Sequence, residues 1–73
     1  MGLAILTVNG IVYDGRYDPN GACFISNVAV APIPSNTVGL LQMVDPERAP
    51  IGPAQNRVIT GVGFNHRTVY FAL

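Results

Sequence analysis

The residues of this sequence best suited to nucleophilic catalysis are its single cysteine, Cys23, and its single histidine, His66. A cysteine nucleophile needs a base within hydrogen-bond reach and a third group that orients the imidazole. Nothing in the spacing places the two together, because Cys23 lies in an apolar run and His66 in a turn signal. Free cysteine in an apolar run is commonly a small buried hydrophobe. We therefore expect Cys23 to be buried and unreactive, and we predict no catalytic residue and no enzymatic activity.

A metal or cofactor site is not predicted either. One cysteine and one histidine cannot assemble an ordinary zinc site within a single chain. Residues 14–21 (DGRYDPNG) gather oxygen ligands and glycines as calcium loops do. However, Arg16 stands where such a loop wants an acid, and no distal glutamate follows. We interpret the segment as a stretch of turn-forming residues and expect no cofactor.

The charges of the chain are few and balanced. The sequence contains four arginines, four acidic residues and no lysine, so the formal net charge is zero. An average chain of this length would carry about 18 charges. Neutrality argues against a nucleic-acid partner and against a polybasic membrane-surface segment. No apolar run approaches the length of a membrane span, and no basic region precedes the apolar residues 3–6, so neither a transmembrane segment nor a secretory signal is expected.

The first two predicted strands form a hairpin. Residues 3–8 (LAILTV) and 11–13 (IVY) are apolar and favour β-structure, and Asn9-Gly10 separates them. This is the strongest short hairpin signal, because both central residues of a type I′ turn need positive φ. We predict a further turn at Asp14-Gly15 and a loop over 16–21.

The rest of the chain reads as short strands separated by turn residues. Strands are predicted over 22–31, 37–44, 57–64 and 67–73, and the first of these is apolar on both faces, as a central strand would be. A helix over 37–44 is disfavoured by its length and by Gly39. The sequence predicts a single all-β domain over 1–73, a small barrel or sandwich of about six short strands.

Residues 45–56 (DPERAPIGPAQN) form an unusually long connection with prolines at 46, 50 and 53. Asp45 and Pro46 suit a helix N-cap and first turn, so one helical turn over 46–48 is predicted, followed by an extended arm without ladder pairing. Prolines lower the entropy lost on docking, and Ile51 is expected to be exposed like an anchor residue. An interface arm and an ordinary surface loop are both compatible with this segment.

Size and composition together favour assembly. A chain of 73 residues builds a marginal core, and with no disulfide or metal available oligomerisation is the remaining means of stabilisation. The expected function is a structural protein–protein assembly subunit, a homo-oligomer or part of a larger shell such as a virion decoration or minor capsid component. The alternative is a small oligomeric barrel that binds a ligand or peptide at a subunit interface. Most aromatic residues are expected in the core; the predicted interface residues are Tyr13, Tyr17, Pro50, Ile51 and Pro53.

Overall fold

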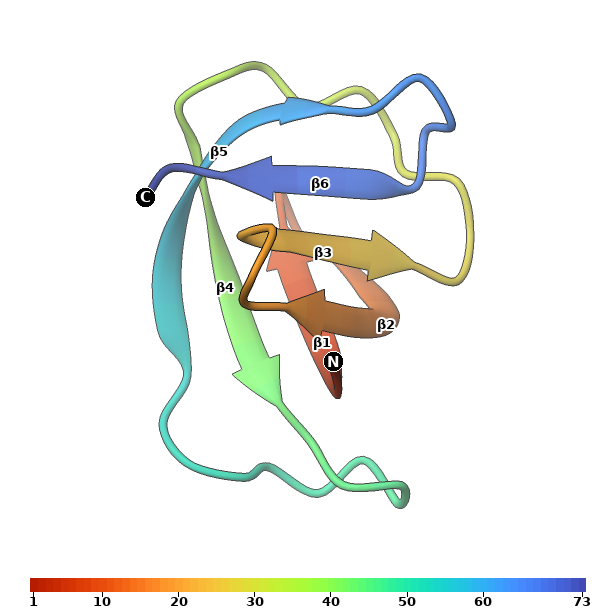
Figure 1. Ribbon diagram of the computed structural model, residues 1–73, viewed down its shortest axis with the longest axis vertical. Coiled ribbons are helices and arrows are strands. Elements are labelled where there is room, and N and C mark those ends of the chain that lie inside the picture. Colours follow the sequence, from red (N-terminus) through yellow and green to blue (C-terminus); the bar gives the residue numbers. More distant parts are fainter.

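The computed structural model describes all residues from 1 to 73 and is a closed antiparallel barrel of six strands (Figure 1). In chain order these are β1 (Gly2–Val8), β2 (Ile11–Asp18), β3 (Cys23–Ser26), β4 (Thr37–Met43), β5 (Gln55–Val62) and β6 (Thr68–Phe71). Around the barrel the order is β1-β2-β3-β6-β5-β4. The predicted all-β class is confirmed, and of the two predicted architectures the chain adopts the barrel. It forms no helix that is long and apolar enough to cross a membrane.

The N-terminal hairpin turns where the sequence predicts. Val8 pairs with Ile11, and Asn9 and Gly10 have φ values of 51° and 78°, as a type I′ turn requires. The turn predicted at Asp14-Gly15 is wrong, because β2 runs through both residues to Asp18.

Gly15 has a packing role within β2. It pairs with Ala4 on β1 and with Ser26 on β3. A Cβ at this position would lie 2.1 Å from the carbonyl oxygen of Ile25 and 2.9 Å from the Phe24 ring. A glycine inside a strand marks such a close approach of backbones. The residue therefore allows β2 and β3 to curve around the ring of Phe24.

The strand predicted over 22–31 is too long, because β3 ends at Ser26. Residues 27–36 instead cross one end of the barrel, where Val30 is buried and Ile33 packs against the core. The backbone N–H of Val30 donates to the carbonyl of His66 at 2.7 Å, and that of Ala31 donates to the Tyr13 hydroxyl at 3.0 Å. The apolar residues on both faces of this stretch thus reflect a strand followed by a segment that closes the barrel.

The core lies inside the barrel and is small. Only 16 of 73 residues are buried, so the interior contributes limited stability. Inward positions alternate along the strands, and the largest fully buried side chains come from five different strands: Leu6, Phe24, Leu41, Ile59 and Val69. Closure gives every strand a neighbour on both sides, although residues 55–57 of β5 pair only with β4.

The two ends of the barrel differ. The end that we call the arm end carries the N-terminus and the connection between β4 and β5, in the lower part of Figure 1. The C-terminus lies elsewhere: Figure 1 shows it at the left beside β5, where the N–H of Ala72 donates to the Val58 carbonyl. The opposite end carries the Asn9-Gly10 turn, residues 27–36 and the turn that precedes β6. We use the term arm for residues 45–54, since Gln55 and Asn56 already belong to β5.

The arm has no ladder of its own, as predicted, but it is folded back on β4 by one isolated bridge instead of extending away from the barrel. Val44 forms a bridge with Pro50, and the N–H of Ile51 donates to the Met43 carbonyl at 2.8 Å. The Asp45 carboxylate accepts the N–H groups of Glu47 and Ala49, each at 2.9 Å. Residues 46–48 form a turn and no helix, because Arg48 has a φ of 68°, in the left-handed region.

Replacing Gly15 with alanine tests the close approach of β2 and β3. The added Cβ meets a backbone carbonyl that cannot move without breaking the ladder, so we expect Gly15→Ala to lower the free energy of unfolding by about 3 kcal/mol. Gly61→Ala is the matched control, because a Cβ there would have no neighbour within 4 Å. Urea unfolding of both variants measures the difference. Equal midpoints for the two variants would show that the approach is not tight in solution.

Candidate interaction surface

The two candidate nucleophilic partners lie apart in the barrel. Cys23 begins β3, opposite Tyr70 on β6, whereas the N–H of Ser26 at the far end of β3 donates to the Arg67 carbonyl. His66 lies beyond that end, so the length of β3, about 10 Å from Cys23 to Ser26, lies between the two residues. The structure therefore does not bring the imidazole to the thiol.

The Cys23 thiol lies under the turn that joins β2 to β3. The residue is 7% exposed, and Asp18 on β2 is its register partner. Burial, and to a smaller extent the charge of Asp18, raises the pKa of the thiol above its ordinary value. Both causes disfavour the thiolate, the form that reacts.

Residues 14–21 do not enclose a cation. Most of them belong to β2, in which Asp14 and Arg16 point outward and Gly15 and Tyr17 inward. The Asp18 carboxylate accepts the N–H of Asn20 at 3.0 Å, as turn-forming aspartates do. No three His, Cys, Asp or Glu side chains of the chain gather where they could hold a metal ion.

Of the predicted interface residues, Tyr13 lies in the core. It is 6% exposed, and its hydroxyl accepts a hydrogen bond from the closing segment 27–36. Its position beside a turn suggested the surface, but alternation along β2 directs it inward next to Leu6. Tyr13 is therefore not available as a contact residue, and this prediction is corrected.

Tyr17 lies at the arm end of the barrel, in a cluster that the sequence did not predict. The guanidinium of Arg57 stacks over the rings of Tyr17 and Phe71, with its carbon 5.4 Å and 4.9 Å from the two ring centroids. Arg57 Nη1 also donates to the Tyr17 hydroxyl at 2.9 Å. The sequence could have indicated this position, because Arg57 is two residues from Ile59 and residues two apart in a strand share a face. Ile59 is a core residue, so Arg57 also points inward.

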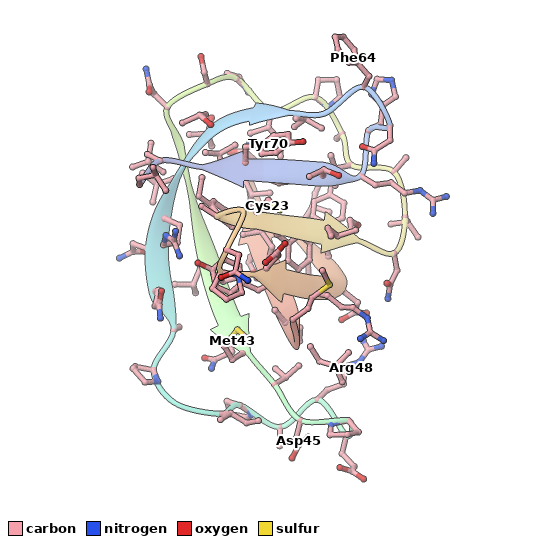
Figure 2. All side chains as sticks on the ribbon, viewed as in Figure 1. Cys23, Met43, Asp45, Arg48, Phe64 and Tyr70 are labelled. Atoms are coloured by element: carbon pink, nitrogen blue, oxygen red, sulfur yellow. The ribbon has the colours of Figure 1, made fainter.

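The other predicted interface residues lie on the arm, which two contacts hold in place. Arg48 forms an ion pair with Asp14 on β2. The Gln42 side-chain amide donates to the carbonyl of Gly52 at 3.0 Å. Pro50, Ile51 and Pro53 are all exposed, and the Ile51 side chain is 56% exposed. Figure 2 shows Asp45 and Arg48 on this arm, below Met43 at the end of β4.

Phe64 is an exception to the expectation that most aromatic residues lie in the core, which Tyr13, Phe24, Phe71 and the adjoining Tyr17 fulfil. It is fully exposed at the tip of the loop between β5 and β6, and Figure 2 shows it pointing away from the barrel. A bulge between Ile59 and Gly61 shifts the alternation, and β5 ends at Val62, so Phe64 lies beyond the last paired residue. Asn65 holds the loop by accepting the N–H groups of Arg67 and Thr68.

The largest unpredicted feature is a surface without charges, which we name the uncharged flank. It consists of the outward side chains of β4 and β5: Val38, Leu40, Gln42, Asn56, Val58 and Thr60. Its centre is apolar, because Val38 pairs directly with Val58 across the two strands and Leu40 follows. These three side chains are 55%, 39% and 42% exposed, respectively. Sheet faces that meet water usually carry polar residues at such positions.

A single pocket lies between the arm and the strands β1 and β2. Its volume is about 90 Å³, and its lining includes Asp14, Asn27 and Arg48. That volume accommodates about three waters, whereas sites for small molecules usually exceed about 300 Å³. The pocket is thus too small for an ordinary organic ligand.

Compared with known protein families, with curated proteins and with solved structures, the chain matches none. Its function therefore has to be inferred from the barrel and its surface.

Replacing Arg57 tests the cluster at the arm end. We expect Arg57→Ala to lower the free energy of unfolding by about 1–2 kcal/mol, because it removes two cation–π contacts and one hydrogen bond. Arg57→Lys should recover only part of the lost free energy of unfolding, since an ammonium lacks the planar stacking surface of a guanidinium. Arg67→Ala, at an exposed arginine without such contacts, is the control. Equal urea midpoints for the Arg57 and Arg67 alanine variants would contradict the prediction.

The reactivity of Cys23 tests its burial. We expect a thiol reagent to modify the native protein at pH 8 at least 100-fold more slowly than the urea-unfolded chain. The raised pKa predicts that the native rate increases only as the pH passes the ordinary range of a thiol. A spectrophotometric reagent at several pH values measures both rates. Comparable native and unfolded rates would show that the thiol is accessible.

Proposed function

We propose that this protein is a structural assembly subunit, which acts by binding other protein chains. The observation that carries the proposal is the uncharged flank, with its exposed apolar centre of Val38, Leu40 and Val58. Exposed apolar residues that gather on one side of a small soluble domain are typical of protein interaction sites. Depletion of charge is likewise characteristic of the centre of protein interfaces.

Barrel closure restricts how such a subunit can bind. The six strands pair around the complete barrel, so no strand has an edge that is free along its whole length for a strand from another chain. Contacts must therefore use outward side chains or loops. The flank supplies such side chains, and the arm supplies a loop that is held in place by its pairing with β4.

Assembly also addresses the small core. A barrel with 16 buried residues and no disulfide has little internal stabilisation. Burying the flank against another chain would remove further apolar surface from water, at about 25 cal/mol per Å². This stability depends on protein concentration, as mass action requires for any assembly.

The arm is the second proposed contact. Pro50, Ile51 and Pro53 are exposed on a loop whose backbone hydrogen bonds already restrict it. A pre-organised loop loses less entropy when it docks. Ile51 is its one large apolar side chain and would fill a pocket on the neighbouring chain.

A virion decoration or a minor capsid component is one setting that suits such a subunit, since a shell requires small modules that pack through their sides. The proposal includes no catalysis, no cofactor and no nucleic-acid binding. The net charge of zero disfavours nucleic-acid binding. The alternative, a barrel that binds a ligand at a subunit interface, has less support because the 90 Å³ pocket is too small.

Replacing Ile51 with aspartate tests the arm contact. The carboxylate would be desolvated in the contact, so we expect Ile51→Asp to weaken assembly at least about tenfold while the β-barrel signal in circular dichroism is retained. Ala54→Asp is the matched control, because it places the same charge on the same exposed loop. Sedimentation and thermal unfolding at several concentrations measure the effect.

Two outcomes would count against this proposal. If Ile51→Asp assembles with unchanged affinity, the arm is only a connection between β4 and β5. If parent and variants sediment at the monomer mass of 7.7 kDa and unfold at the same temperature at every concentration, self-assembly is absent and the proposal loses its main support.

A further inference from the structure

We propose that the uncharged flank binds the same flank of a second copy of this chain, about a two-fold axis that passes near β4 and β5. The inference rests on the assembly function proposed above and names the partner and symmetry of one contact.

The distribution of charge over the barrel wall places this side farthest from the charged strand, although the outward faces of β1, β3 and β6 carry no charge either. Among outward strand positions, charges occur only on β2, at Asp14, Arg16 and Asp18. The order β1-β2-β3-β6-β5-β4 places β5 directly across the barrel from β2. Arg57, the one charged residue within β5, points inward and stacks on aromatic rings. The side centred on β5 is therefore the most distant from the charged strand.

Two-fold contact makes a specific demand on charge. In such an interface, residues close to the axis lie against their own copies, so a charge there would meet a like charge. Away from the axis, different residues meet, so charges could pair there. An uncharged apolar centre, as at Val38, Leu40 and Val58, is therefore suited to the region around the axis of a two-fold contact.

Asn56 is the polar residue of the flank that can bond to its own copy. Its side-chain amide both donates and accepts hydrogen bonds, whereas an arginine only donates and an ionised aspartate only accepts. The donors of the other two polar residues are used within the chain: the Gln42 amide donates to the Met43 and Gly52 carbonyls, and the Thr60 hydroxyl donates to the Tyr70 carbonyl. The Gln42 amide is directed by its bond to the Gly52 carbonyl, so the arm lies at the rim of this contact.

The area of the flank is compatible with a stable dimer. A standard interface buries about 800 Å² on each partner, which is about 18% of the 4416 Å² that one chain exposes. β4 and β5 are two of the six strands of the closed barrel. Two strands of six are one third of the strands of the wall, a larger share than the roughly 18% that a standard interface requires. At the centre, the Val38–Val58 pair and Leu40 supply the apolar contact.

The first test compares two exposed valines with nearly equal exposure. Val38 on the flank is 55% exposed, and Val28, in the segment at the end opposite the arm, is 57% exposed. We expect Val38→Asp to weaken dimerisation at least 100-fold, because two carboxylates approach each other across the axis. Val28→Asp should leave the dimerisation constant within about threefold. Sedimentation equilibrium measures both, and circular dichroism verifies that each variant is folded.

The second test identifies the partner and the symmetry. Val38, Leu40 and Val58 are each replaced singly by cysteine and the proteins are mildly oxidised. A residue near a two-fold axis meets its own copy within disulfide distance, so at least one variant should give a cross-linked species of twice 7.7 kDa. The parent, whose only cysteine is buried, should give none.

The outcomes separate this inference from the proposed function. If the parent assembles and Val38→Asp has no effect, the flank is not the interface and the inference is overturned, while assembly stands. If Val38→Asp disrupts assembly but no single cysteine cross-links, the flank meets a different surface, and the two-fold contact is overturned. A parent that is monomeric at all concentrations overturns both.

Discussion

The closed hydrogen-bond ladder is the constraint on which the other features of this protein depend. Closure requires β1 to pair with β4 and β3 to pair with β6, in addition to the chain neighbours. A six-strand barrel encloses little space, so small inward residues must lie beside large ones. Gly15 lies against Phe24, and Gly39 lies against Leu6 and Ile59, at distances where a Cβ would displace its neighbours. The narrow interior thus determines which side chains can point inward.

The same alternation that fills the interior also arranges the outer surface. Once the register is set, every second residue must point outward, whatever its chemistry. On β2 this places acids and an arginine in water beside the exposed Val12, and on β4 and β5 it places only apolar and uncharged polar side chains there. Because the barrel is closed, these outward side chains and the loops are the main means of contact. The restriction of outward charge to β2 is therefore a consequence of the register.

The arm end shows how loops are restrained by this barrel. The arm pairs with the end of β4, and the Arg48–Asp14 ion pair joins it to β2 on the other side of β1. An exposed ion pair of this kind contributes little stability, so the backbone pairing and the Asp45 turn determine the conformation. Inside the barrel wall, the Arg57 guanidinium lies over the rings of Tyr17 and Phe71 and so joins β5 to β2 and β6.

Local chemistry made some features predictable from sequence. Asn9-Gly10 specifies its turn because both residues tolerate positive φ, and short β-favouring runs between turn residues predicted the all-β class. The number of strands follows from the same turn residues, which divide the chain into six β-favouring runs. By contrast, Gly15 was misinterpreted as part of a turn, because a glycine that permits a turn also permits close packing within a strand. Sequence cannot distinguish these roles without knowing that Ile25 lies opposite.

The sequence by itself determined the strands, the hairpin and the scarcity of charge. Tertiary structure decided the strand order and barrel closure, and with them the side of the wall on which each side chain lies. The inward placement of Tyr13 and Arg57 and the charge-free surface of β4 and β5 depend on pairings between segments distant in the chain. The physical reason is that turns follow from a few adjacent residues, whereas the grouping of side chains on a surface follows from long-range register.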